Sequence, residues 1–139
     1  MARRRTETRA RARALQALYV WDMRGQPDLE RLAERVWDEL AVGSEERRMA
    51  AALIHVIAAR GDEVDRSLKE VTENWRMERL GAIERSVLRL AAAELTIAET
   101  PPRVVLQESI RLAERYGSPQ SAKFVNGVLD ALARRMGRL

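Results

Sequence analysis

Several residue types on which enzymes commonly rely are absent or scarce in this chain of 139 residues. It contains no cysteine, which excludes disulfide bonds, thiol nucleophiles and cysteine-based metal sites. The single histidine, His55, lies within an apolar helical run, which favours a packing role over that of a ligand or a general base. No glycine-rich phosphate loop, nucleophile motif or pair of metal ligands is present. We therefore expect a binding protein rather than an enzyme, with no catalytic residue, no metal and no cofactor.

Long apolar runs are also missing. The longest, residues 49–59, is too short to cross a bilayer and is interrupted by His55. The arginine-rich N-terminus is not followed by the apolar stretch of a secretory signal. Because the lack of cysteine is compatible with a reducing compartment, we expect a cytoplasmic protein without a membrane contact.

Glycine and proline are scarce, with 7 and 4 residues, and most of them separate segments of helical periodicity. Aromatic residues make up 4% of the chain, whereas aliphatic residues are plentiful. A chain of this length suits one domain. The sequence therefore predicts a single all-α domain over 1–139, with a basic arm and helix start (1–13), an N-terminal helical half (about 14–75) and a C-terminal helical half (about 76–139).

About seven helices are expected from apolar periodicity and from start and stop signals. The apolar positions of the third keep one phase through Gly61, which predicts one continuous helix. Gly117 can end the sixth helix, while Ser118 can cap the last one and Pro119 suits its first turn. The expected segments are residues 6 or 8 to 24, 29–40 after an Asp28 cap, 45–71, a short helix near 76–80, 82–98, 102–116 and a final helix from 119.

Three positions on the last two thirds of the chain invite a specific interpretation. Glu94 falls in the middle of an apolar helix face, so it needs a partner, either an arginine or the helix start at Pro102. Glu84 lies beside Leu88 on a second, narrower stripe, which could be a docking surface or ordinary helix packing. Phe124 flanks the apolar face of the last helix and could either contact a partner or seal the core edge.

Charge is distributed unevenly along the chain. Residues 1–13 carry six arginines and one glutamate, while the remaining residues carry 19 basic and 20 acidic side chains. The domain is therefore close to neutral, and its N-terminus is a basic arm. This pattern indicates a polyanion such as a nucleic acid, with a simply solvated basic face as the alternative.

The run Phe124-Val125-Asn126-Gly127-Val128-Leu129-Asp130, with Tyr116-Gly117 and Ser121 before it, resembles the C-terminal signature of the NusB family of bacterial transcription antitermination factors. Three further stretches agree in order and spacing, so that the resemblance covers about residues 9–130. They are Ala14–Tyr19, Asn74-Trp75 leading into Glu84–Leu95, and the segment from Pro102 through Glu108–Ala113.

The resemblance implies an all-helical fold of two small packed helical bundles. It also implies binding of boxA, an element of nascent ribosomal RNA operon transcripts, together with the small-subunit ribosomal protein NusE. Other Nus factors and RNA polymerase would be indirect partners, and premature termination would be suppressed. The implied RNA-binding residues are Arg4, Arg5, Arg9, Arg11, Arg13, Gln16, Gln120, Lys123 and Phe124, and the implied NusE-binding residues are Tyr19, Glu84 and Leu88.

Two departures and two alternatives accompany this resemblance. Glu7 and Thr8 stand where basic residues are common in relatives, which leaves the contact register of the arm open, and Ala92-Ala93 provides little packing volume before Glu94. One alternative is a structural homodimer whose basic arm is only solvated. The other is a NusB-like domain related to rRNA cytosine methyltransferases, which the absence of cysteine and of a catalytic half disfavours.

Overall fold

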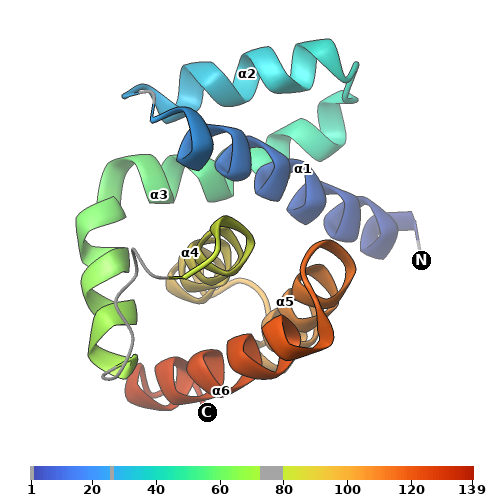
Figure 1. Ribbon diagram of the computed structural model, residues 1–139. Coiled ribbons are helices and arrows are strands. Elements are labelled where there is room, and N and C mark those ends of the chain that lie inside the picture. Colours follow the sequence, from blue (N-terminus) through green and yellow to red (C-terminus); the bar gives the residue numbers. More distant parts are fainter. Residues whose placement is uncertain (1, 26, 73–79) are drawn as a thin grey trace.

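The computed structural model describes residues 2–25, 27–72 and 80–139, with side chains from Arg5 onward. Within these ranges the chain forms six α helices and no strand (Figure 1). The all-α prediction is confirmed, and the expected number of about seven helices becomes six, because the short helix near 76–80 falls almost entirely outside the described residues. The helices are α1 (Ala2–Arg24), α2 (Leu29–Glu39), α3 (Ser44–Val71), α4 (Ala82–Ile97), α5 (Pro102–Tyr116) and α6 (Pro119–Arg135).

Two predicted caps define helix starts. The Asp28 carboxylate accepts a hydrogen bond from the Arg31 backbone N–H at 3.0 Å and begins α2. The Ser118 hydroxyl accepts one from the Ser121 N–H at 3.1 Å and begins α6. Each bond satisfies a backbone donor that the helix itself leaves unpaired. The first helix starts at Ala2, earlier than expected, so the basic arm is helical.

The third helix has the predicted extent but is not straight. Arg60 has non-helical angles, with φ −128° and ψ 28°, so α3 bends one residue before Gly61. Val64 and Leu68 after the bend are buried, as are Leu53 and Ile57 before it. The apolar phase therefore continues through a bend that periodicity alone does not reveal.

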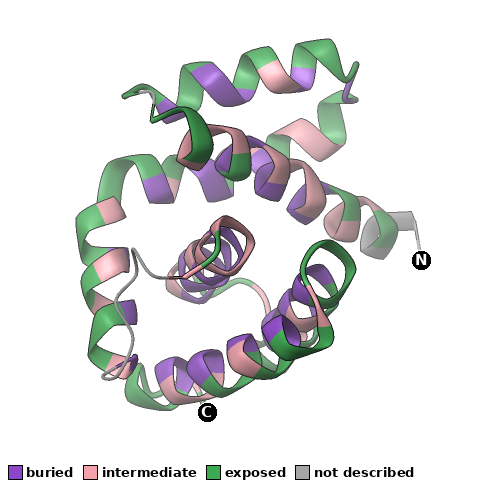
Figure 2. Cartoon of the chain, viewed as in Figure 1, coloured by how far each residue is buried: buried purple, intermediate pink, exposed green. Residues whose placement is uncertain are grey.

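The centre of the molecule is α4. In Figure 1 this helix is seen nearly end on, surrounded by α1, α3, α5 and α6, all of which it contacts, while α2 packs on α1 and α3. Figure 2 shows the buried positions of the outer helices turned towards the interior. A helix that is apolar nearly all round is expected to be central. Its buried residues are Ser86, Val87, Leu88 and 90–95.

Charged side chains tie α4 to the N-terminal helices. Arg85 Nη2 donates to Asp22 Oδ2 of α1 at 2.6 Å, and Arg89 Nη1 lies 3.3 Å from Asp22 Oδ1. Arg89 also binds both carboxylate oxygens of Asp65 on α3, at 2.9 and 3.2 Å, and lies 5.6 Å from the ring centre of Trp21. Burial would raise the pKa of Asp22, but the hydrogen bond and charge of Arg85, with Arg89, lower it below its ordinary value. These pairs join α1, α3 and α4.

Across the described ranges, no helix combines the length and the apolar character that a membrane crossing requires.

Candidate functional site

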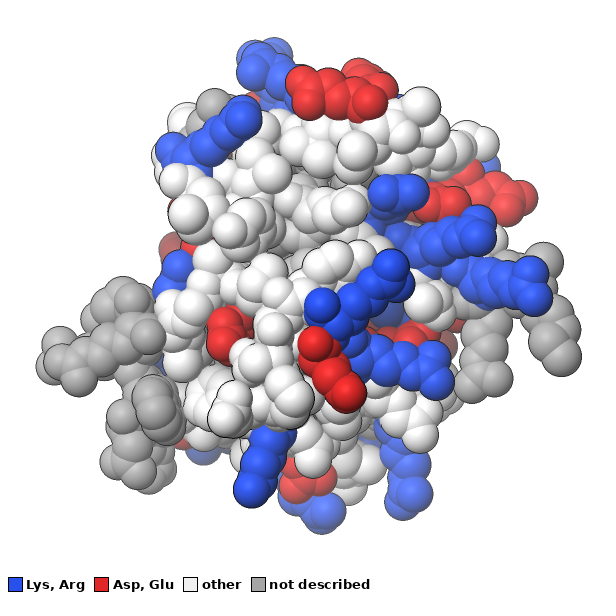
Figure 3. Space-filling view, turned by 45° about the vertical axis from the view of Figure 1, so that its right-hand side comes forward, with Lys and Arg blue, Asp and Glu red and all other residues white. Residues whose placement is uncertain are grey.

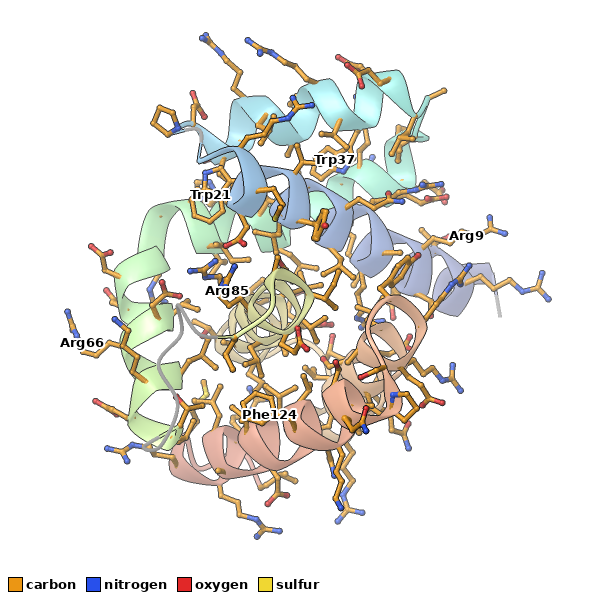
Figure 4. The ribbon with its side chains drawn as sticks, viewed as in Figure 1. Arg9, Trp21, Trp37, Arg66, Arg85 and Phe124 are labelled. Atoms are coloured by element: carbon orange, nitrogen blue, oxygen red, sulfur yellow. The ribbon has the colours of Figure 1, made fainter. Side chains whose placement is uncertain are left out.

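The outer face of α1 presents the basic residues that the sequence singles out. Arg5 and Arg9 are exposed, and Gln16 lies on the same side because it is 11 residues, or about three turns, after Arg5. Arg9 extends away from the body of the molecule, opposite to Arg66 on α3 (Figure 4). In Figure 3, lysine and arginine side chains gather on the side where α1 begins, with some acidic side chains among them. The side chain of Arg4 lies outside the described part.

Arg13 and Gln16 are half-buried and linked to one another. Arg13 Nη1 donates to Gln16 Oε1 at 3.3 Å, and Arg13 Nε lies 3.4 Å from Glu46 Oε1 of α3. Part of the Arg13 charge is therefore offset within the protein. Arg5 and Arg9 are the two described positions of the arm that project most fully into solvent.

The predicted role of Arg11 as an RNA-binding residue has to be corrected. The Arg11 side chain is 3% exposed, and its guanidinium binds both oxygens of Glu94 at 2.8 and 2.6 Å and Glu108 Oε1 of α5 at 3.1 Å. Thr8 Oγ1 also donates to Glu108 Oε1, at 2.5 Å. A guanidinium enclosed in this way holds α1 against α4 and α5, and its hydrogen-bond donors are engaged by carboxylates of the protein.

The burial of Arg11 has a signal in the sequence. Arg11 precedes Leu15 by four residues and Leu18 by seven, which places it on the buried side of α1. Burial would lower its pKa, but the hydrogen bond and charge of Glu94, with the charge of Glu108, raise it above its ordinary value. Of the two expected partners of Glu94, an arginine or the helix start at Pro102, the structure provides the arginine, which comes from the arm itself.

The start of α6 forms a second exposed surface. Gln120, Lys123 and Gly127 are exposed and lie on one side of the helix. A Cβ atom on Gly127 would meet nothing within 4 Å, so no described part of this chain requires glycine there. Phe124 is half-buried and packs against the core, on the side of α6 that faces α4 (Figure 4). Of its two interpretations, the core-edge role fits this position.

The predicted role of Leu88 as a partner-binding residue also has to be corrected. Leu88 is fully buried at 0% exposed, because α4 is enclosed on several sides, and it cannot take part in a surface contact without unfolding. Tyr19 is 40% exposed on α1. Met23 follows it by one helical turn and is 62% exposed, a feature that the sequence analysis missed. Two apolar side chains four residues apart on one helix would form a small contact surface.

Glu84 is half-buried in the first turn of α4, where a negative charge suits the helix dipole. Its Oε1 accepts a hydrogen bond from Ser121 Oγ of α6 at 2.7 Å. A Cβ on Gly81 would lie 2.5 Å from Glu84 Oε2, so this glycine leaves room for the carboxylate. The side chain is thus oriented by the protein before any partner binds.

Among the described residues, no three or more histidine or acidic side chains are grouped so that they could hold a metal ion.

Comparison with known proteins gives consistent matches. The NusB family profile matches residues 8–134. The chain is 37% identical over 131 residues to the transcription antitermination protein NusB of a Nitratiruptor species, a match that spans 94% of each protein. It is similar to T. maritima NusB, with a TM-score of 0.85 and 34% identity over 92% of this chain and 90% of that one. It is also similar to a chain in a crystal structure of the antitermination factors NusB and NusE in complex with dsRNA, with a TM-score of 0.85, 31% identity and coverage of 97% and 99%.

Proposed function

This chain belongs to the NusB family, and from this premise we propose that it binds RNA together with a NusE-type ribosomal protein. The RNA that we propose is boxA of nascent ribosomal RNA operon transcripts. The resulting assembly would suppress premature termination by RNA polymerase, with other Nus factors as indirect partners. The support for a joint RNA and NusE complex is the similarity to the chain in the NusB–NusE–dsRNA crystal structure.

The observation that carries the RNA-binding proposal is the exposed pair Arg5 and Arg9 on a helical arm of a domain that is otherwise nearly neutral. Guanidinium groups bind phosphate oxygens well because their donors match the geometry of the anion. Phosphate contacts also release counterions, so binding should weaken steeply with salt. Gln16 on the same face, Arg13 at its edge, and Arg4 at its start would extend the contact.

The exposed face of α6 would provide the second RNA contact. Lys123 offers a positive charge, Gln120 offers an amide, and Gly127 leaves the helix backbone uncovered. Backbone exposed at a glycine permits close approach of a phosphate or sugar. Phe124 would support this face from the core edge rather than stack on a base.

The proposed NusE surface consists of Tyr19, Met23 and Glu84. Tyr19 and Met23 supply exposed apolar area, and Glu84 supplies a charge that Ser121 already orients. Partly desolvated charges at such a surface contribute mainly to specificity and to the lifetime of the complex.

The experiment is a gel-shift with a boxA-like RNA and a scrambled RNA, each with and without NusE. We expect weak binding of either RNA by the protein alone and tight binding of the boxA-like RNA only when NusE is present. Failure to bind any RNA at low salt in the presence of NusE would refute the proposal.

A further inference from the structure

A groove of about 590 Å³ lies between α1 and α5, beside the arginine face of α1. Thr8 and Ala12 line it from α1, and the buried Leu112 lines it from α5. Ala12 is three residues after Arg9 and seven after Arg5, so the groove continues the surface on which those arginines lie. It is separate from the α6 face and from the Tyr19–Glu84 surface described above.

The rim of the groove carries exposed cationic and aromatic side chains of α5. The Arg111 side chain is 79% exposed, and Tyr116 is 38% exposed. The Arg115 guanidinium lies 5.5 Å from the centre of the Tyr116 ring, so the two planar groups form one cation–π pair at the end of the helix. Glu114 also lines this rim, so the rim has two arginines and one glutamate.

The inner carboxylate does not oppose an anionic ligand. Glu108 Oε1 accepts from Thr8 Oγ1 at 2.5 Å and from Arg11 Nη1 at 3.1 Å. Its other oxygen, Oε2, lies 3.7 Å from Arg111 Nη1 at the rim, so the charge of Glu108 is compensated within the protein. At the opening, Arg111 and Arg115 outweigh the single Glu114 by one positive charge, which favours a phosphodiester.

Resting on the proposed RNA-binding function, we propose that this groove binds one unpaired nucleotide of the RNA. Tyr116, with Arg115 beside it, provides the stacking surface for the base, and Arg111 contacts the adjoining phosphate. Stacking on an aromatic ring together with a cationic edge is the combination by which proteins hold single-stranded RNA. The apolar floor at Leu112 and Ala12 accommodates the face of a base, and Arg5 and Arg9 hold the phosphates that precede it.

The test uses single-stranded RNAs that carry the fluorescent base 2-aminopurine at successive positions, bound to the full-length protein. Wild type should quench one position strongly, because stacking on tyrosine quenches this base. Tyr116→Leu should abolish that quenching and weaken RNA binding by about tenfold. The salt slope, which is the change in the logarithm of the RNA-binding constant with the logarithm of the salt concentration, should be unchanged. Tyr116→Phe should restore both. Arg111→Gln should flatten the salt slope by about 0.7, the value for one phosphate contact on a single strand.

The matched control is Arg66→Gln, which removes the same charge from the opposite side of the molecule (Figure 4). Circular dichroism checks that each variant is folded. If Tyr116→Leu does not fold, the groove assignment is tested by the quenching in the wild type and by the salt dependence of RNA binding in Arg111→Gln. Normal quenching and affinity in folded Tyr116→Leu would overturn the groove assignment, while RNA binding that depends on Arg5 and Arg9 would leave the proposed function intact. Loss of NusE affinity instead of RNA affinity would make the groove a protein-docking surface and would also overturn the assignment.

Discussion

Arg11 is the residue on which the position of the basic arm depends. It is bound by Glu94 of α4 and Glu108 of α5, both of which are nearly enclosed. Removal of the cation in Arg11→Met would leave the buried Glu94 carboxylate without its arginine partner and would leave Glu108 with only Thr8 and the more distant Arg111. We expect the free energy of unfolding to fall by about 3–5 kcal/mol, measured by urea denaturation at pH 7. Arg13→Met, which removes a more exposed cation from the same helix, should cost less than about 1 kcal/mol. Equal losses of unfolding free energy in Arg11→Met and Arg13→Met would contradict the structural role of Arg11.

Substitutions of Glu84 can distinguish partner binding from RNA binding. Glu84→Lys reverses a partly desolvated charge and should weaken NusE binding by about 2–5 kcal/mol, measured by calorimetry. It also breaks the bond from Ser121, so stability should fall by about 1 kcal/mol while the fold persists. Glu84→Gln keeps an acceptor for Ser121 and controls for this loss. RNA binding without NusE should be unchanged in both. An unaltered NusE affinity in Glu84→Lys would refute the assignment.

Single residues differ in how far the sequence predicts their role. The need of Glu94 for a partner follows from its position on an apolar face, and the structure supplies Arg11. The family resemblance groups Arg11 with its arginine neighbours as an RNA contact, although its phase relative to Leu15 is that of a buried residue. The exposure of Met23 depends on how α1 ends against its neighbours, which local spacing does not encode.

At the scale of elements, α1 is both a core helix and a basic arm. Because Thr8 contacts Glu108, truncation of the arm would disturb packing, so substitutions are the better test. The double variant Arg5→Gln/Arg9→Gln should flatten the salt slope of single-stranded RNA binding by about 1.4, the value for two phosphate contacts. Its melting temperature should scarcely change.

The matched control for this arm is Arg35→Gln/Arg66→Gln, which changes the net charge equally at exposed positions on α2 and α3. A salt slope that falls equally in both double variants would mean that overall charge, and not the arm, governs binding. An unchanged slope in Arg5→Gln/Arg9→Gln would mean that the arm is only solvated.

Helix ends were predictable because caps act locally. Asp28 and Ser118 each satisfy a backbone donor within three residues, so their effect is visible in the sequence. The bend at Arg60 was not predictable, because the apolar phase of α3 continues across it. The double apolar stripe of α4 was also ambiguous, since both stripes pack once the helix is central, and Leu88 is buried for that reason.

At the scale of the whole molecule, Asp22 helps to hold the N-terminal helices on α4. Its pKa is lowered in the folded protein, relative to about 3.9 in an unfolded chain. The stabilisation is therefore complete above the unfolded pKa and is lost as the pH falls through the folded one. Asp22→Asn should lower the free energy of unfolding by about 3 kcal/mol at pH 7, and the loss should shrink as the pH falls below the unfolded pKa and through the lowered folded pKa of Asp22. Urea denaturation across this range measures the difference, and a pH-independent loss would contradict the electrostatic origin.

The most direct test of the central claim is the thermodynamic coupling between RNA and NusE on this protein. Calorimetric titration gives the affinity for NusE with and without boxA-like RNA, and the affinity for the RNA with and without NusE. If RNA and NusE bind cooperatively, both affinities rise by the same factor because linkage is reciprocal, and we expect a factor of about 5 to 150. The scrambled RNA should give a smaller factor. Equal affinities with and without the second component would contradict the account.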